Sequence, residues 1–321
     1  MEQKELIFFE WVIFDNCNLQ CPYCVNKGEF SHKDTSQMLY NPGREVDVAR
    51  KIVELSPMAK KVVVNLTGGE PLLARNIKEV ISILKTSPNV KINLITNFAL
   101  IEKVMDHVES IDSILVSLHI RLRSTLEMDH FVSLINRIKT ITSLSLSQVD
   151  YELSYENRNA IRNLSLKTGL KVDLQSFIPP WTEKGRMDKG EEIRDATFTR
   201  SFGKRCSLGH FYYFLLPDGT YYHGLWCDPK TRKTGNLLAP FEQNQESFYH
   251  TSMAKCPASS CACNYNNLYY RIYREECRRL GYPRNEVFGR INVRIDYELF
   301  RKMRQIKQKF VDKLHEKRTR A

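Results

Sequence analysis

The sequence predicts an α/β fold of six consecutive βα units, followed by a smaller region that contains a hairpin and a helix. Three observations support this prediction. Up to about residue 180, short runs of β-branched and aliphatic residues alternate with longer segments of helical period, as in parallel strands joined by helices. With 42% hydrophobic and 11% aromatic residues, the 321-residue chain can bury a large core. Further along, Pro217-Asp218-Gly219-Thr220 is a turn sequence typical of a hairpin.

Each predicted strand is a short apolar run, and the segments between them place apolar residues at helical spacing. Six such units give either an open doubly wound sheet or an incomplete barrel, and both folds carry their chemistry at the carboxyl ends of the strands. Gly169 follows the fifth helix, where it suits a C-cap. We expect strands at residues 6–14, 61–66, 90–95, 113–118, 145–153 and 171–177, and helices at residues 46–55, 75–85, 101–108, 126–140 and 156–168.

The chain is expected to divide into four parts. Residues 1–180 form the βα domain, and the polar stretch 181–204 is a linker or lid. Residues 205–283 hold the hairpin, and residues 284–321 are expected to form a basic amphipathic helix. That last segment carries twelve Lys and Arg against five Asp and Glu, so most of the net charge of +11 lies within it. A basic tail can bind nucleic acid, but such a helix is more often a solvated outer face, which we expect here.

The nine cysteines are expected to be thiols. The first residues lack the features of a secretion signal, and the longest apolar run, residues 6–14, is interrupted by Glu10 and is too short to span a membrane. We therefore expect a cytoplasmic protein, in which metal ligation explains the cysteines better than disulfides do. No cysteine lies between Cys24 and Cys206, so two separate sites are expected.

The first site is the triplet Cys17, Cys21 and Cys24, which directly follows the first predicted strand. Three thiolates on a cubane of four irons leave one iron open, as a catalytic metal site requires. A zinc site with a fourth ligand such as His32, or three ordinary core cysteines, are the alternatives on spacing alone.

Thr67-Gly68-Gly69-Glu70-Pro71 ends the second predicted strand, beside the triplet in any parallel arrangement. The two glycines would let the backbone approach a ligand closely, and the Glu70 carboxylate could accept hydrogen bonds from an ammonium group. Alone, the motif would more often be a simple turn. Next to the triplet it indicates a binding site.

Together these motifs resemble the radical S-adenosylmethionine (SAM) superfamily, whose signature is a C-x3-C-x-aromatic-C loop and a Gly-Gly-Glu-Pro motif. The resemblance covers residues 4–180 and implies a partial (β/α)6 barrel similar to a TIM barrel. It implies that the three cysteines hold a 4Fe–4S cluster whose open iron binds the amino and carboxylate groups of SAM. By the same resemblance, Gly68, Gly69 and Glu70 contact the SAM amino group, and Tyr23 packs near the adenine.

In the family, further SAM contacts come from the ends of later strands, which here offer Asn97, Ser117, His119 and Gln175. Many relatives carry Ser-x-Asp where this chain has Ser117-Leu118-His119, so contacts with the ribose or carboxylate are expected to differ. His119 fits a SAM ligand or a substrate acid/base, and a hydrogen-bonded structural histidine fits equally well.

The C-terminal cysteines resemble the SPASM and twitch extensions of radical SAM enzymes. A full SPASM domain carries more cysteines and binds two auxiliary clusters, so this resemblance implies one auxiliary 4Fe–4S cluster, with a structural zinc site as the alternative. Two ligands flank the hairpin and two more come from a later group of three. The five candidate ligands are Cys206, Cys227, Cys256, Cys261 and Cys263, whereas Cys277 is expected to be unligated.

The resemblance implies an oxidoreductase or isomerase that cleaves SAM to a 5′-deoxyadenosyl radical and takes a hydrogen from its substrate. We expect a small molecule such as a sugar, aminocyclitol, nucleoside or amino acid, and a flavodoxin- or ferredoxin-type electron donor. A maturase of ribosomal peptides is the alternative, disfavoured because only sixteen residues precede the triplet. A non-catalytic iron–sulfur protein that binds nucleic acid is a third reading, opposed by Gly68, Gly69 and Glu70.

Overall fold

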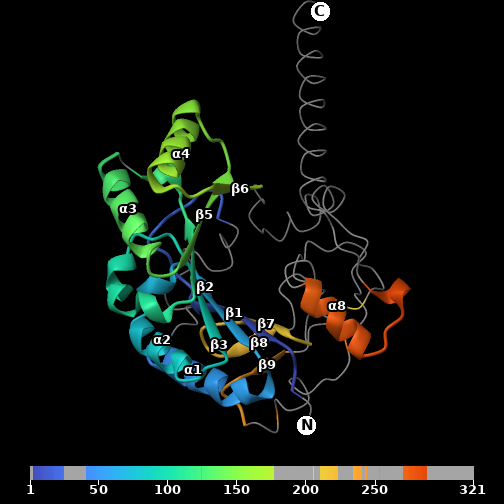
Figure 1. Ribbon diagram of the computed structural model, residues 1–321. Coiled ribbons are helices and arrows are strands. Elements are labelled where there is room, and N and C mark those ends of the chain that lie inside the picture. Colours follow the sequence, from blue (N-terminus) through green and yellow to red (C-terminus); the bar gives the residue numbers. More distant parts are fainter. Residues whose placement is uncertain are drawn as a thin grey trace, which may run out of the picture.

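Six parallel strands alternate with helices in chain order and curve into a partial barrel, with the helices on its outer side (Figure 1). The computed structural model describes residues 3–24, 41–123, 125–176, 205, 210–222, 234–240, 243, 253 and 270–287. The alternation of parallel strands and helices predicted from the sequence is confirmed. Its elements are β1 (Ile7–Phe14), α1 (Arg44–Leu55), β2 (Val62–Gly68), α2 (Ile77–Lys85), β3 (Val90–Thr96), β4 (Ser113–Ser117), α3 (Thr125–Ile138), β5 (Ser143–Asp150), α4 (Tyr155–Thr168) and β6 (Val172–Ser176).

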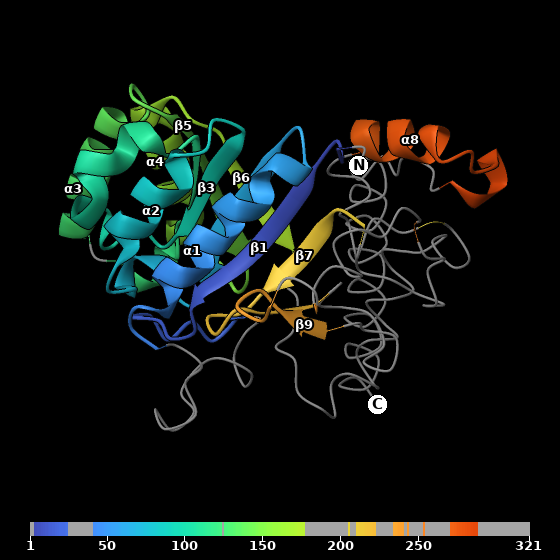
Figure 2. The same cartoon turned by 90° about the horizontal axis from the view of Figure 1, so that it is seen from below.

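The main core lies between the sheet and these helices, which Figure 2 shows beside the strands. Successive side chains of a strand point to opposite faces, so Phe9, Trp11 and Ile13 of β1 are fully buried toward the helices. On α2, Val80 and Leu84 lie four residues apart and are fully buried in the same core. The helices are therefore held by their apolar stripes.

Two connections differ from the helices expected there. The segment Ile101–Ser110 forms a 3-10 helix with a kink at Val104, whereas an α-helix was expected at residues 101–108. The helix expected from residue 75 begins at Ile77, because Pro71–Leu73 form a 3-10 turn of their own after Glu70. Gly169 ends α4 with a φ of 69°, as the C-cap prediction requires.

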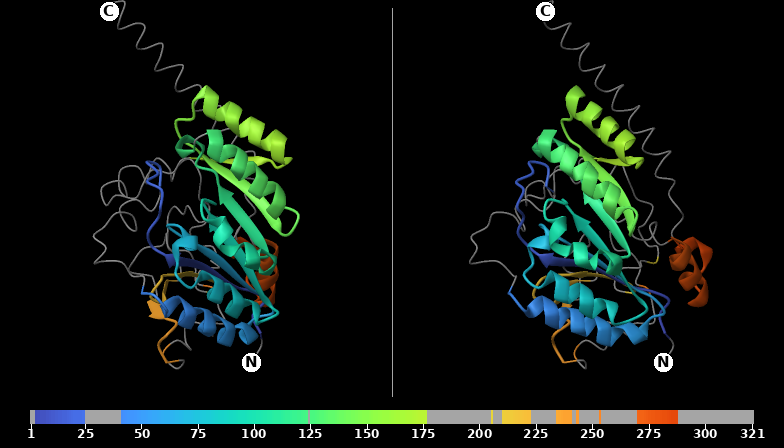
Figure 3. Two further views of the ribbon diagram at one scale, coloured as in Figure 1. Left: turned by 90° about the vertical axis from the view of Figure 1, so that its left-hand side faces the viewer. Right: turned by 60° about the vertical axis from the view of Figure 1, so that its left-hand side comes forward.

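The predicted hairpin is confirmed, and it continues the main sheet. Its strands are β7 (Tyr212–Leu215) and β8 (Thr220–Tyr222), and β9 (Thr234–Asn236) pairs with β8. β7 runs parallel to β1, so the strand order is β6-β5-β4-β3-β2-β1-β7-β8-β9 (Figure 3). The Phe8 and Tyr212 rings stack with centroids 5.2 Å apart and support this junction.

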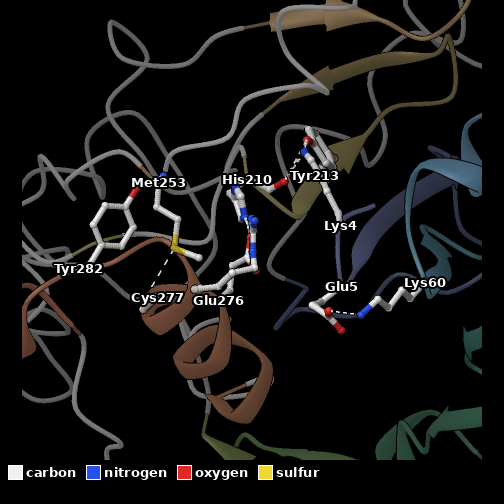
Figure 4. A network of polar contacts seen from close by, with 10 residues as sticks. Lys4, Glu5, Lys60, His210, Tyr213, Met253, Glu276, Cys277 and Tyr282 are labelled. Atoms are coloured by element: carbon white, nitrogen blue, oxygen red, sulfur yellow. Dashed lines mark hydrogen bonds and ion pairs between the residues drawn. The ribbon is translucent and has the colours of Figure 1, made fainter. Parts of the chain in front are cut away.

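A buried polar network fixes helix α8 (Tyr270–Arg279) to the start of β1 and β7 (Figure 4). The Glu276 carboxylate lies 2.7 Å from His210 Nε2 and accepts two hydrogen bonds from Arg279, at 2.6 and 2.8 Å. Lys4 Nζ donates to the His210 carbonyl at 2.6 Å and to Tyr213 Oη at 3.2 Å. Burial lowers the pKa of Lys4 to about 7, and the charge of Glu276 opposes this shift. The network therefore joins chain segments about two hundred residues apart in sequence.

We expect Glu276→Gln to lower the free energy of unfolding at pH 7 by about 3 kcal/mol. Burial acts to raise the pKa of Glu276, but the hydrogen bonds from Arg279 and His210 outweigh it and hold the pKa at about 2. A lowered carboxyl pKa stabilises the fold above its unfolded value near 4.5, and this stabilisation is lost as the pH falls toward 2. Urea titrations of both proteins from pH 7 to pH 3 measure the difference, which should shrink below pH 4.5.

The neighbouring exposed residue provides the control for this substitution. Glu275→Gln removes the same charge from the same helix at an exposed position, and it should change stability by no more than about 1 kcal/mol. Equal effects of the two variants would contradict the structural role given to Glu276.

Several predicted features lie outside the described residues. These are the linker or lid at 181–204, the candidate ligands Cys206, Cys227, Cys256, Cys261 and Cys263, and nearly all of the basic helix at 284–321. Cys277 is described: its thiol is buried 3.8 Å from the sulfur of Met253, and burial raises its pKa.

Among the helices of the described ranges, none is long and apolar enough to cross a membrane.

Candidate functional site

The cysteine triplet lies at the carboxyl end of β1, on the edge of the sheet where the six parallel strands end. Cys17 N donates to the side chain of Asn16 at 2.8 Å, and Leu19 N approaches Cys17 Sγ at 3.4 Å. Cys24 N donates to the Cys21 carbonyl at 3.1 Å and closes a turn. Local backbone contacts therefore shape the loop before any ligand is considered.

The three thiols are close enough to influence one another's ionisation. Burial, followed by the charges of Cys17 and Cys24, raises the pKa of Cys21 to about 12. Within the described residues, they do not converge with other His, Cys, Asp or Glu side chains on a point that would hold a single metal ion. A cubane cluster would take each thiolate on a different iron, so the three cysteines stay predicted ligands of such a cluster.

Gly68 and Gly69 bring the start of the cysteine loop against the end of β2. Gly69 N donates to the Phe14 carbonyl and Glu70 N to the Asn16 carbonyl, both at 2.8 Å. A Cβ at Gly68 would lie 2.2 Å from the Phe14 oxygen, and one at Gly69 would lie 2.0 Å from the Asn16 oxygen. The sequence led us to expect that the backbone at these glycines lies close to a ligand. In the structure it lies close to the backbone of Phe14 and Asn16.

Glu70 joins the ends of β2 and β3. Its fully buried carboxylate accepts hydrogen bonds from Thr96 Oγ1 at 2.7 Å, Asn97 N at 2.8 Å and Leu72 N at 3.1 Å. Burial raises the pKa of Glu70, while these donors and the charge of Arg123 oppose the shift. The carboxylate is thus engaged by the protein, and its contact with the SAM amino group stays a prediction.

Asn97 links the end of β3 to the cysteine loop. Its Nδ2 donates to Asn18 Oδ1 at 2.7 Å and lies 3.8 Å from Cys17 Sγ. Arg123 donates to the carbonyls of Asn97 and Leu118, and its guanidinium lies 4.3 Å from the centroid of the Phe131 ring. The role of Arg123 in holding two strand ends together becomes visible only from these contacts.

His119 and Tyr23 surround the sulfur of Cys21. His119 Nδ1 lies 3.3 Å from Cys21 Sγ and 3.0 Å from Tyr23 Oη, and the two rings stack with centroids 5.8 Å apart. His119 adopts a left-handed backbone with a φ of 47°. Burial, reinforced by Arg123, lowers the pKa of His119 to about 4, so the imidazole is neutral near pH 7.

Tyr151 completes this aromatic group and was not found by sequence reasoning. The centroid of the Tyr151 ring lies 5.6 Å from that of the Tyr23 ring. The Arg121 guanidinium also contacts Tyr151 and lies 5.5 Å from the centroid of its ring. Tyr23 is 4% exposed between its two aromatic neighbours. Because Tyr151 falls inside the fifth predicted strand, residues 145–153, its position in the sequence carried no signal of a place at the site.

The structure does not bring all predicted cofactor residues to the triplet. Ser117 is half-buried at the end of β4, opposite Ser147 of β5. Gln175 is exposed on β6, opposite Val149. No contact among the described residues joins either side chain to the cysteine loop, so their cofactor contacts stay predictions.

Comparison with known proteins agrees with this geometry. Residues 11–139 match the family described as Radical SAM superfamily. A probable GTP 3′,8-cyclase of Archaeoglobus fulgidus is 37% identical over 90 residues, which are 27% of this chain and 26% of the relative. GTP 3′,8-cyclase of Staphylococcus haemolyticus is 28% identical over 191 residues, which are 58% of this chain and 52% of the relative. The chain thus spans about half or less of the length of these relatives.

The fold is also similar to a solved structure of anSMEcpe with bound AdoMet, with a TM-score of 0.53 and 15% sequence identity. The match covers 86% of this chain and 94% of that one, which shows a shared fold. The cysteine triplet, the Gly-Gly-Glu-Pro motif and the family match lie in the same part of the barrel. Residues 11–139 of the chain therefore carry a domain of the radical SAM superfamily.

Proposed function

We propose that the protein reductively cleaves SAM and uses the resulting 5′-deoxyadenosyl radical to take a hydrogen from a small-molecule substrate. The observation that supports this best is that the cysteine loop, Glu70, Asn97 and His119 meet at one edge of the sheet. Each comes from the carboxyl end of a different strand, which is where barrel enzymes keep their chemistry.

Three thiolates, from Cys17, Cys21 and Cys24, would hold a 4Fe–4S cluster. When bound, the cluster supplies an electron to SAM and an open iron for its amino and carboxylate groups. Around it, Asn97 holds the cysteine loop, and neutral His119 with Tyr23 surrounds the Cys21 sulfur. Burial of these groups keeps water from the reacting atoms and fixes the donors in advance.

Among the candidate substrates, the names of the relatives favour a nucleoside or nucleotide, since both relatives are GTP 3′,8-cyclases. A sugar, an aminocyclitol or an amino acid is consistent with the same radical chemistry. We propose that GTP is tested first, because both of these relatives carry it in their names.

We further propose an auxiliary 4Fe–4S cluster in the C-terminal region and a flavodoxin- or ferredoxin-type electron donor. The auxiliary ligands would be Cys206, Cys227 and two of the three cysteines at 256, 261 and 263. The support is their sequence pattern, which resembles that of twitch domains.

Anaerobic purification and reconstitution, iron and sulfide counting, and an assay for 5′-deoxyadenosine with SAM and dithionite test this proposal. About eight irons per chain with 5′-deoxyadenosine formed are expected for two clusters. About four irons with cleavage would remove the auxiliary cluster and keep the radical chemistry. Zinc in place of iron, with no cleavage under reducing conditions, would reject the proposal.

A further inference from the structure

A row of polar side chains crosses four strands on the face of the sheet that points away from α1 to α4. On β1, the buried neighbours Phe9 and Trp11 face the helices, so Glu10 between them points to the inner face. The pairing registers place Glu10 opposite Asn65 of β2, Asn65 opposite Asn93 of β3, and Asn93 opposite Ser113 of β4. We call these four residues the polar row.

Hydrogen bonds in the polar row all run toward Glu10. Ser113 Oγ donates to Asn93 Oδ1 at 2.7 Å, and Asn93 Nδ2 donates to Asn65 Oδ1 at 2.8 Å. Asn65 Nδ2 then donates to Glu10 Oε2 at 3.1 Å. Three side chains are thereby oriented so that the chain of donors ends on one carboxylate.

Glu10 lies among apolar neighbours on the inner face. Phe214 of β7 is its register partner on the other side, and Phe8 and Val12 belong to the second core cluster. Burial raises the pKa of Glu10 to about 7, and the Asn65 hydrogen bond opposes the shift. Such a carboxylate gains from a partner that donates hydrogen bonds or carries positive charge.

The second carboxylate oxygen of Glu10 has no partner among the residues that the structure describes. Glu10 is half-buried, and no donor in the described part of the chain contacts Oε1. By contrast, the carboxylate of the fully buried Glu45 accepts hydrogen bonds from Gly43 N and from the backbone and side chain of Asn76. Within the described residues, both oxygens of the Glu45 carboxylate are thus hydrogen-bonded, whereas Glu10 has a hydrogen bond on Oε2 alone.

The polar row lies below the candidate active site on the same strands. Glu10 is four residues before Phe14, the last residue of β1, which places it roughly 13 Å along the strand from the start of the cysteine loop. A small molecule of two or three rings spans this distance. A molecule of that length that lay along the strand would have one end at Glu10 and the other near the cysteine loop.

We infer that the polar row is a substrate-binding site, in which Glu10 Oε1 accepts a hydrogen bond from an amino group of the substrate. This inference rests on the proposed function and narrows its substrate class to compounds that carry an amino group. The amino group can be an ammonium, as in amino sugars, or the exocyclic amine of a nucleobase. Asn65, Asn93 and Ser113 orient the carboxylate, and Phe8 and Phe214 flank it.

The first test asks whether Glu10 is accessible in the folded protein. The reconstituted protein is treated with a water-soluble carbodiimide and glycinamide, and the modified carboxyls are identified by peptide mass spectrometry. Glu10 is expected to couple at least about ten times faster than Glu45, whose carboxylate is buried and hydrogen-bonded. Equal protection of the two residues would overturn the inference, because no ligand could then reach the carboxylate.

The second test measures recognition of the amino group. Dissociation constants are determined by calorimetry, with SAM present, for two matched pairs: GTP against inosine triphosphate, and D-glucosamine against D-glucose. In at least one pair the amino compound should bind about ten times or more tighter, as expected for a hydrogen bond to a charged group. In Glu10→Gln this preference should fall to about twofold or less.

The two pairs distinguish the two sources of the amino group, a nucleobase and an amino sugar. Glu156→Gln, on an exposed face of α4, is the matched control and should keep the preference for the amino compound. Absence of a preference in both pairs, or its survival in Glu10→Gln, would overturn the inference. Neither test requires turnover. A wild-type protein that fails to form 5′-deoxyadenosine therefore rejects the proposed function separately.

Discussion

Cys21→Ala is expected to abolish SAM cleavage, lowering the rate of 5′-deoxyadenosine formation by about a thousandfold or more. Cys21 is the middle residue of the triplet, and its sulfur lies 3.3 Å from His119 Nδ1 in a buried setting. In the predicted cluster site alanine would leave one iron without its thiolate, because Cys17 and Cys24, the other described thiols of the loop, would each already hold an iron. Iron content, the electron paramagnetic resonance signal of the reduced protein and the 5′-deoxyadenosine assay measure the effect.

Cys277→Ala is the matched control for this variant. Cys277 is also a buried thiol, but it packs beside Met253 in the second core cluster. Its replacement should cost about 1 kcal/mol of stability and leave iron content and SAM cleavage unchanged. Retained cleavage in Cys21→Ala would show that the triplet is not the cluster site, whatever the control does.

The alternating order of strands and helices could be predicted from the sequence because apolar residues recur at a different spacing in the strands than in most of the helices. Strand residues such as Phe9 and Trp11 fill the core at every second position, and α2 fills it at every third or fourth. The α-helix predicted after β3 was wrong, because a kinked 3-10 helix around Val104 buries apolar residues at nearly the spacing of an α-helix. The parallel pairing of β7 with β1 depends on contacts between segments far apart in the sequence, and the spacing of apolar residues does not reveal such contacts.

The cysteines and the Gly-Gly-Glu-Pro motif could be found in the sequence because their spacing is local. The contacts that Asn97 and His119 make with the loop could not be found there, since they depend on the order of the strands. The same holds for the hydrogen bond from Arg123 to the Asn97 carbonyl. The described close neighbour of Gly69, the backbone of the loop after β1, could not be found from the sequence for the same reason, and the contact of the glycines with SAM stays a prediction. Two adjacent glycines indicate that some group lies close to the backbone, but only the fold shows which group it is.

Gly69→Ala is expected to displace the cysteine loop and to cost about 3 kcal/mol or more of stability. The new methyl carbon would lie 2.0 Å from the Asn16 oxygen and 2.9 Å from the Cys17 nitrogen. Both are backbone atoms, and the same Asn16 oxygen accepts the hydrogen bond from Glu70 N. The clash can be relieved only by moving the segment that leads into Cys17, so we also expect a large loss of bound iron.

Gly169→Ala separates this steric effect from the general cost of replacing a glycine. Gly169 has a φ of 69° and no atom within 4 Å of an added Cβ, so alanine there should cost about 1 kcal/mol through its left-handed backbone and leave bound iron unchanged. Melting temperature and iron content of the two variants are measured side by side. A Gly69→Ala protein that melts and binds iron like the Gly169→Ala protein would contradict the contact between the cysteine loop and β2, because a methyl group cannot occupy the space that this contact leaves.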